Sequence, residues 1–259
     1  MKQFIPTALG IMAKVSGEKL AGRHETGIDE FMARKIAEEM LAFQSDTGVT
    51  PVLLPGGGNF VRGRDHQTSS SVLRAEADYE GMIGTAKNAE ALAEALRELG
   101  HQAICLLTLS KPDRAPDQRH LDLYDRHIAR DYLNLGRIVV LGGGTGKPYC
   151  STDLACVMLG GDVGVERIMK GTNAPGVYNG DPRQLDHTGL RLFRTLGFKQ
   201  ALEAGYDVLE ASAWATALSG PKLPITVYDM NQPGNMLRAY RGEIGTVVSA
   251  DGEPTYWDD

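Results

Sequence analysis

Two apolar runs of strand length in this chain each end in a glycine triplet. The run 52–54 (VLL) leads to glycines 56–58, and the run 138–141 (IVVL) leads to glycines 142–144. Glycine leaves backbone N–H groups uncovered, so such a turn can hold an anion, and Arg62 could add a fixed positive charge to the first one. A glycine triplet taken alone is equally compatible with a turn that needs glycine only for close packing. Because open α/β sheets bind ligands at the carboxyl ends of their strands, we expect both turns at one such edge, holding phosphate.

The rest of the chain alternates apolar runs of strand length with amphipathic stretches of helix length. This alternation is typical of an α/β protein with a largely parallel sheet covered by helices. No linker of Pro, Gly or Ser divides the chain, so we expect one domain over residues 1–259, with two functional halves that meet near residue 150. The tail 249–259 is expected to be peripheral. We expect strands at 11–15, 52–54, 103–107, 138–141, 165–169, 225–228 and 244–248, and helices at 28–43, 78–99, 121–135, 151–158, 192–204 and 211–218.

Composition limits the partners that this chain can have. A formal charge of −6 over 259 residues argues against a protein that coats nucleic acid or an anionic membrane. No run approaches the roughly 20 apolar residues of a membrane span, so we expect a cytoplasmic protein. The three cysteines, Cys105, Cys150 and Cys156, form no CxxC pair, and no HExxH is present, so we expect neither a disulfide framework nor a protein-held metal.

Standard catalytic motifs are also absent from the sequence. No GxSxG, HRD or DFG occurs, which disfavours acyl transfer and protein phosphorylation. The first glycine turn has Val61 where a dinucleotide fingerprint has its third glycine. The second resembles a Walker loop only in Gly146 and Lys147, because Pro148 stands where a magnesium-binding Ser or Thr would be.

Six stretches nevertheless follow one another in the order of a known family. They are AKVSGEKLAG, GGGNFVRG, ADYEGMIGTAKNAEALAEAL, GTGKPYCSTD, KGTNAPGVYNGDP and LPITVYDMNQPGNMLRAYRGEIGT, which together run from residue 13 to residue 246. In these motifs the chain resembles the bacterial UMP kinase (uridylate kinase) branch of the amino acid kinase superfamily. The resemblance implies a three-layer α/β/α sandwich, transfer of phosphate from ATP to UMP, Mg²⁺ bound with ATP, and a homohexamer.

The resemblance also assigns residues to the two nucleotides. Acceptor binding falls in the half before about residue 150, with Gly57 at the acceptor phosphate and Asp78 at the ribose hydroxyls. Asp78 could also serve as the N-cap of the helix expected from residue 78. The remainder of the implied acceptor pocket is Thr145, Gly146, Lys147, Pro148, Tyr149, Cys150, Ser151 and Thr152.

ATP binding is assigned mainly to the half after about residue 150. The implied donor residues are Lys14, Val15, Ser16, Gly17, Gly58, Arg62, Lys170, Thr172, Tyr178 and Asp181. Of these, Lys14 and Arg62 would offset charge on the transferred group, and Asp153 and Asp181 would orient magnesium and the basic groups. Simpler interpretations stay open: Lys14 as a surface lysine, Asp153 as a helix cap and Asp181 as a turn residue before Pro182.

The sequence departs from the family pattern in the acceptor segment. Lys147 replaces an asparagine, Cys150 replaces the second aromatic residue and Ser151 replaces the first threonine. Glu210 replaces an aspartate in the half assigned to ATP. A paralogue with another phosphate, phosphonate or carboxylate acceptor therefore stays open, as does a non-catalytic ligand-binding or storage protein of the same fold, because a fold does not fix a substrate.

Overall fold

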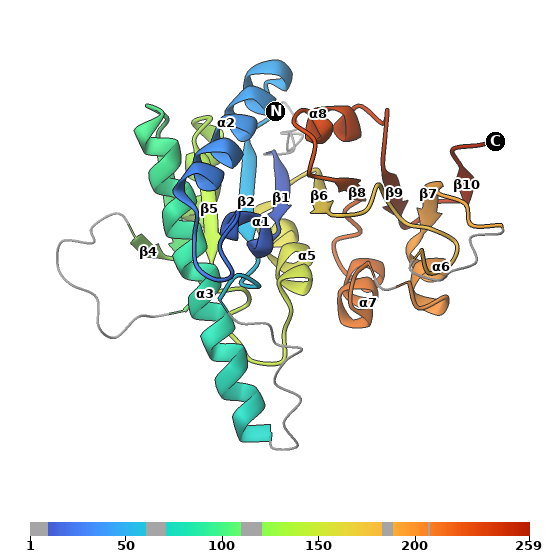
Figure 1. The fold of residues 1–259 in the computed structure, drawn as a ribbon, viewed down its shortest axis with the longest axis horizontal. Coiled ribbons are helices and arrows are strands. Elements are labelled where there is room, and N and C mark those ends of the chain that lie inside the picture. The colour runs from blue at the N-terminus through green and yellow to red at the C-terminus, as the bar shows by residue number, and fades with distance from the viewer. Residues whose placement is uncertain (1–9, 61–70, 110–120, 183–188, 207) are drawn as a thin grey trace, which may run out of the picture.

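The computed structural model describes residues 10–60, 71–109, 121–182, 189–206 and 208–259 (Figure 1). Within these residues ten strands form one sheet, in the order β10-β7-β9-β8-β6-β1-β2-β5-β3-β4. The strands are β1 (Ile11–Val15), β2 (Pro51–Pro55), β3 (Ala103–Leu107), β4 (Leu121–Leu123), β5 (Ile138–Gly142), β6 (Arg167–Thr172), β7 (Phe193–Gly197), β8 (Ile225–Asp229), β9 (Thr246–Ser249) and β10 (Thr255–Tyr256). The helices are α1 (Gly17–Ala21), α2 (Glu30–Thr47), α3 (Ser71–Glu98), α4 (Arg126–Asn134), α5 (Thr152–Val163), α6 (Phe198–Glu203), α7 (Ala211–Ser219) and α8 (Asn235–Tyr240).

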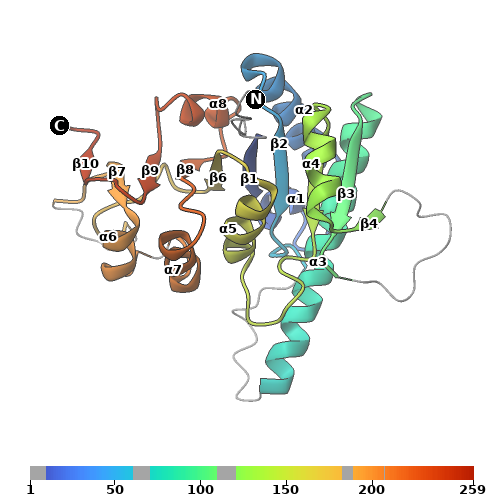
Figure 2. The ribbon, with the colours of Figure 1, turned by 180° about the vertical axis from the view of Figure 1, so that it is seen from behind.

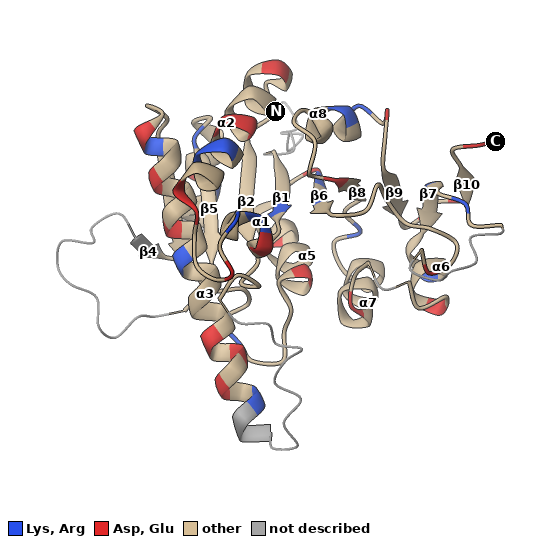
Figure 3. Ribbon diagram, in the orientation of Figure 1, with Lys and Arg blue, Asp and Glu red and all other residues tan. Residues whose placement is uncertain are grey.

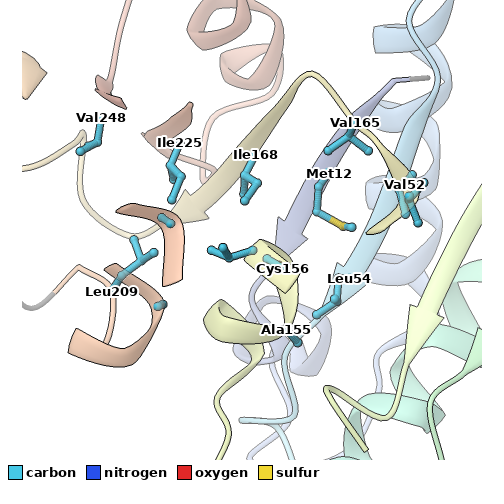
Figure 4. Close-up of a cluster of buried hydrophobic side chains, with 14 of the residues drawn as sticks. Met12, Val52, Leu54, Ala155, Cys156, Val165, Ile168, Leu209, Ile225 and Val248 are labelled. Atoms are coloured by element: carbon cyan, nitrogen blue, oxygen red, sulfur yellow. The ribbon is translucent and has the colours of Figure 1, made fainter. Parts of the chain in front are cut away.

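Helices cover both faces of this sheet. Successive strand residues point to opposite faces, so Ile11 and Ala13 of β1 pack with α2, α3 and α8, whereas Met12 packs with α4, α5, α6 and α7. Figure 2 shows the second set of helices from its own side, and Figure 4 shows part of the core beneath α5. All described strand pairs are parallel except β8 with β9 and β7 with β10. The predicted three-layer α/β/α sandwich with a mostly parallel sheet is confirmed.

Local sequence signals explain where several helices begin and end. Asp29 caps α2 by accepting the Phe31 N–H at 3.0 Å, and Gly48 ends that helix in the left-handed conformation. Ser151 caps α5 in the same way through the Leu154 N–H at 3.2 Å. None of the helices among the described residues is both long and apolar enough to cross a membrane.

Several predicted elements match the structure and others are wrong. The strands at 11–15 and 103–107 are confirmed, but the predicted helix 121–135 begins only after Asp125, because its first residues form β4. The predicted helix 192–204 divides into β7 and α6, and the strand predicted at 165–169 runs from Arg167 to Thr172. The tail is not peripheral, since β10 pairs with β7 and the Trp257 side chain donates to the Gly245 carbonyl at 2.7 Å.

The longest helix begins seven residues earlier than predicted. Because α3 starts at Ser71, Asp78 lies within the helix and is not its N-cap, so that alternative is wrong. In Figure 1 the first turns of α3 project beyond the sheet, below the carboxyl ends of the strands. This projection forms one wall of the site described next.

The chain path opens a crevice between two neighbouring strands. The parallel strands β2 and β5 are adjacent, but β2 leads to α3 on one face of the sheet and β5 leads to α5 on the other. Loops that diverge in this way leave room for a ligand at the carboxyl ends of the strands. The two glycine turns predicted from sequence follow these two strands.

Candidate active site

A carboxylate lies between two lysines at this edge of the sheet. Lys14 of β1 and Lys170 of β6 are register partners on neighbouring parallel strands, and Asp153 comes from the first turn of α5. The Asp153 carboxylate lies 2.5 Å from the Lys170 ammonium and 3.8 Å from that of Lys14. The side chains are only 10–15% exposed, and Lys170 also donates to the Val208 carbonyl. The sequence predicted all three residues, and the structure brings them together.

Burial and charge act in opposite directions on this cluster. Burial alone would raise the pKa of the Asp153 carboxyl, but Lys14 and Lys170 together outweigh it and hold the pKa below its usual value. Burial lowers the pKa of Lys170, and the positive charge of Lys14 lowers it further. The negative charge of Asp153 acts in the opposite direction and raises this pKa. One carboxylate therefore balances two ammonium groups, and the cluster keeps an excess positive charge that an anion can use.

The β2 turn faces this cluster. A Cβ placed on Gly56 would lie 3.7 Å from the Lys14 ammonium and 3.8 Å from the Thr152 hydroxyl. Gly57 instead packs against α3, where a Cβ would meet the Gly81 carbonyl oxygen at 2.6 Å. Close packing is thus confirmed at Gly57, whereas anion binding at Gly56, which faces the lysines, stays a prediction.

Two threonines hold the β5 turn in place. The Thr85 hydroxyl of α3 accepts the Gly143 N–H at 2.8 Å and donates to the Met82 carbonyl. The Thr108 hydroxyl contacts the Gly142 and Gly144 carbonyls at 3.2 and 3.1 Å. Gly143 and Gly144 have φ angles of 88° and 60°, a conformation that other residues rarely adopt.

A pocket of about 270 Å³ lies between the two turns and the projecting part of α3. Seven of the predicted site residues line it, namely Gly57, Gly58, Asp78, Tyr149, Cys150, Ser151 and Thr152. The predicted Thr145, Gly146, Lys147 and Pro148 do not line this pocket, and Lys147 and Pro148 are exposed. Glu210 reaches the pocket from the other half of the chain, although the sequence placed it with ATP.

The Asp78 carboxylate anchors one wall of this pocket. One of its oxygens accepts the Tyr149 N–H at 2.8 Å, and the other pairs with Arg74 at 3.0 Å, one helical turn away. Tyr149 has a φ of 63°, which is unusual for a residue with a side chain. The hydrogen bond to Asp78 therefore ties a locally strained turn to α3.

Five pocket residues were not predicted from sequence, namely Arg74, Ala77, Gly81, Met82 and Thr85. All five belong to α3 and recur at helical spacing around Asp78. Gly144, which also lines the pocket, belongs to the second glycine turn that the sequence singled out for anion binding. For Arg74 and Ala77 the helical spacing could not be used, because the helix was expected to begin at residue 78.

The predicted donor residues take several different positions. Val15 ends β1, Ser16 is the N-cap of α1 and Gly17 is its first residue, packed so closely that a Cβ would lie 2.6 Å from the Gly56 carbonyl oxygen. Thr172 ends β6, where its hydroxyl contacts the Ala174 carbonyl at 2.8 Å.

Two other predicted donor residues follow β6, and one lies elsewhere in the chain. Tyr178 forms an isolated bridge with Leu192, and Asp181 is exposed. Arg62 falls outside the described residues.

Comparisons with known proteins agree over nearly the whole chain. Residues 11–231 match the model of the amino acid kinase family. A uridylate kinase of Bradyrhizobium sp. (strain ORS 278) is 38% identical over 245 residues, which cover 94% of this chain and 98% of that protein. A uridylate kinase of Nitrobacter hamburgensis is 37% identical over 246 residues, or 95% and 99% of the two chains. Among solved structures, a UMP kinase from Bacillus anthracis superposes with a TM-score of 0.83 at 25% identity, over 96% of this chain and 99% of that one.

Proposed function

This chain belongs to the amino acid kinase family, and we propose that within it the chain acts as a UMP kinase, converting UMP and ATP to UDP and ADP. The family resemblance seen in the sequence is confirmed by the matching family model and by the relatives at 37–38% identity. The observation that carries the proposal is the buried cluster of Lys14, Asp153 and Lys170 beside a pocket bounded by two glycine turns.

Phosphoryl transfer needs the features that this cluster provides. Two polyanions must be held in line while their negative charge is offset, and the protein need supply little covalent chemistry. We assign Lys14 and Lys170 to the transferred phosphoryl group, where their positive charge stabilises the transition state. Asp153 orients both ammonium groups by its ion pairs, and its charge opposes the lowering of the Lys170 pKa by burial. Cys156 takes no part as a nucleophile, since burial raises the pKa of its thiol to about 12.

We assign the pocket of about 270 Å³ to the acceptor UMP. The backbone around Gly57 and the hydroxyl groups of Ser151 and Thr152 would bind its phosphate, and Asp78 its ribose hydroxyls. Both Asp78 oxygens already accept a hydrogen bond, but each carboxylate oxygen can accept a second one. Arg74 positions this carboxylate. The proposed acceptor contacts also include Tyr149 and Cys150, with Thr145, Gly146, Lys147 and Pro148 in the adjoining turn.

We assign ATP to the start of α1 and the carboxyl ends of β6 and β8. The proposed contacts are Lys14, Val15, Ser16, Gly17, Gly58, Arg62, Lys170, Thr172, Tyr178 and Asp181. This assignment divides the domain near residue 150 into an acceptor half and a donor half. Six residues of the first half nevertheless contribute to ATP binding, namely Lys14, Val15, Ser16, Gly17, Gly58 and Arg62.

Magnesium would enter this site together with ATP. The described residues contain no group of three or more His, Cys, Asp or Glu side chains that could hold a metal. That fits Mg²⁺, which usually keeps several waters and binds substrate phosphates with one or two carboxylates. Asp181 is the proposed carboxylate, since Asp153 is paired with lysines. When bound, the ion neutralises phosphate charge.

Measurement of ADP release with different acceptors tests the proposal. We expect strong turnover with UMP and ATP, and none with CMP or with small carboxylic or phosphonic acids. Lys14→Ala is expected to abolish turnover and leave the fold intact, as judged by circular dichroism. Turnover by Lys14→Ala at the wild-type rate would refute the site assignment, and turnover with another acceptor only would refute UMP as substrate.

The proposal extends to assembly and cellular role. By likeness to the family we propose a homohexamer in the cytoplasm that serves pyrimidine nucleotide synthesis. Light scattering on the purified protein tests the assembly, for which a mass near six times 28.0 kDa is expected.

A further inference from the structure

Two buried asparagines join the phosphate-binding turn to α3. Asn59 lies at the end of the β2 turn and is 2% exposed, and Asn88 lies on α3 and is fully buried. The side chain of Asn59 pairs with that of Asn88.

The two side-chain amides face each other and use every N–H they have. The Asn88 amide donates to the Asn59 carbonyl oxygen at 2.7 Å and accepts from the Asn59 amide at 2.9 Å. The second N–H of Asn88 donates to the Gly56 carbonyl at 2.7 Å, and that of Asn59 donates to the Gly27 carbonyl at 2.6 Å. Turning either amide over would place oxygen against carbonyl oxygen, so the network fixes one orientation.

Gly56 is the residue through which this pair reaches the candidate active site. Its carbonyl is held by Asn88, its N–H donates to the Val15 carbonyl at 2.8 Å, and its Cα faces Lys14 and Thr152. The peptide that begins the phosphate-binding turn is thus fixed from two sides. Gly27 joins the same network, because its N–H donates to the Asn59 backbone carbonyl at 2.9 Å.

We propose that the Asn59–Asn88 amide pair is a positioning device for phosphoryl transfer. It holds the Gly56 peptide so that the N–H groups of the following glycines face the phosphates beside Lys14. This inference rests on the proposed kinase activity. Neither asparagine touches substrate, so their effect on the reaction passes entirely through the backbone of the turn.

Asn88→Asp tests the direction of the hydrogen bonds. The new oxygen would face two acceptors, the Gly56 carbonyl and the Asn59 side-chain oxygen. In its ionised form the new carboxylate would therefore repel both of these oxygens and displace the turn that carries Gly56. A protonated carboxyl can donate to one of them, and burial raises the pKa of such a group. At pH 8 we expect kcat to fall at least about tenfold, since small displacements of a bound group can cost about 100-fold. The ratio of wild-type to variant kcat should shrink several-fold as the pH falls from 8 to 6.

A second variant removes the pair without a buried charge. Asn59→Leu combined with Asn88→Leu replaces both amides by apolar groups of similar size, but it also takes the side-chain donors away from the Gly56 and Gly27 carbonyls. We expect this double variant to melt below the wild-type temperature but to stay folded at the assay temperature, because each carbonyl left without its donor costs about 1–3 kcal/mol. It should keep KM for UMP and ATP within about threefold and lose at least about tenfold in kcat. Asn134→Asp is the control, because it makes the same substitution at an exposed position of α4, outside the candidate active site. It should leave kcat and its pH profile unchanged.

The outcomes separate this inference from the proposed function. If the wild type does not phosphorylate UMP, the proposed function fails. If the wild type is active and the double leucine variant keeps its kcat, or the Asn88→Asp ratio does not change with pH, the positioning role is refuted. If neither variant folds, the pair is a requirement of the fold and the positioning role is likewise refuted.

Discussion

The most informative single substitution is Asp153→Asn, because among the described residues Asp153 supplies the one carboxylate that pairs with Lys14 and Lys170. The carboxylate lies 2.5 and 3.8 Å from the two ammonium groups, and the side chains are 10–15% exposed. Removing one partner of a buried ion pair costs about 3–5 kcal/mol. We take the lower end, because Lys170 keeps its hydrogen bond to the Val208 carbonyl and can lose its proton. At about 2–4 °C per kcal/mol in a large domain, the melting temperature should fall by roughly 6–12 °C.

The same substitution should affect catalysis and ground-state binding differently. Without Asp153 the two lysines repel each other and Lys170 is easier to deprotonate, so kcat should fall about 100-fold or more, as for lost electrostatic stabilisation elsewhere. An unbalanced lysine pair still attracts a polyanion. ATP should therefore raise the melting temperature of Asp153→Asn by more than it raises that of the wild type. Asp131→Asn, on the exposed side of α4, is the control and should change none of these quantities.

The effect on stability should depend on pH in a defined direction. The pKa of Asp153 in the folded protein is held below its unfolded value of about 3.9. Its contribution to stability is therefore full above about pH 4 and is lost as the pH falls through the folded pKa. The difference in melting temperature between wild type and Asp153→Asn should shrink on acidification below about pH 4. A variant that melts within 2 °C of the wild type at pH 7 and keeps its kcat would refute the reasoning.

Two further predictions concern the pocket that we assign to the acceptor. Cys150 is half-buried in that pocket, whereas Cys105 and Cys156 are 0% and 2% exposed. An alkylating reagent should therefore modify one thiol per native chain. Saturating UMP should slow this reaction at least about fivefold. Mass spectrometry of the labelled peptides checks this, and labelling at a rate independent of UMP would contradict it. Gly57→Ala should destabilise the protein by about 1–3 kcal/mol, because its Cβ would lie 2.6 Å from the Gly81 carbonyl oxygen. Gly81→Ala has open space at the corresponding Cβ and should instead stabilise α3 by up to about 1 kcal/mol, so equal melting temperatures for the two variants would be evidence against the close packing.

Local sequence signals were sufficient for much of the fold. The strands β1 and β3 match their predicted limits because each is a mainly apolar run, interrupted only by Lys14 in β1, and is bounded by polar or glycine residues. The same signal failed at 192–204, where α6 follows β7 directly. No turn separates the two elements, so the sequence shows no boundary between the two-residue period of the strand and the 3.6-residue period of the helix. The signal failed again at the start of α3, whose first turns project beyond the sheet and so lack the apolar stripe that marks a packed helix (Figure 1).

The sequence identified the charged cluster of the candidate site and its glycine turns. Figure 3 shows Lys and Arg positions in blue where β1 approaches α1. Lys14 is the last residue but one of β1, and its place near the end of that strand was predicted from the sequence. The pairing of Asn59 with Asn88 was not visible, because residues 29 positions apart become partners only when α3 packs on the β2 turn. The position of Glu210 in the same pocket as Asp78 was not visible for the same reason. It depends on how the segment before α7 packs against Lys170, which no local pattern encodes.

The start of α5 links the acceptor pocket to the lysine pair. Ser151 caps the helix, Thr152 faces Gly56, and Asp153 balances the two lysines, so three consecutive residues serve three different parts of the site. Two residues in this segment that depart from the family pattern, Cys150 and Ser151, line the pocket, whereas Asp153 matches the pattern. Since the carboxylate is held by its own ion pairs, a change in the two residues before it can reshape the acceptor wall without altering the charge on the lysines. Selectivity for the acceptor can therefore vary in this chain while the machinery for phosphoryl transfer stays the same.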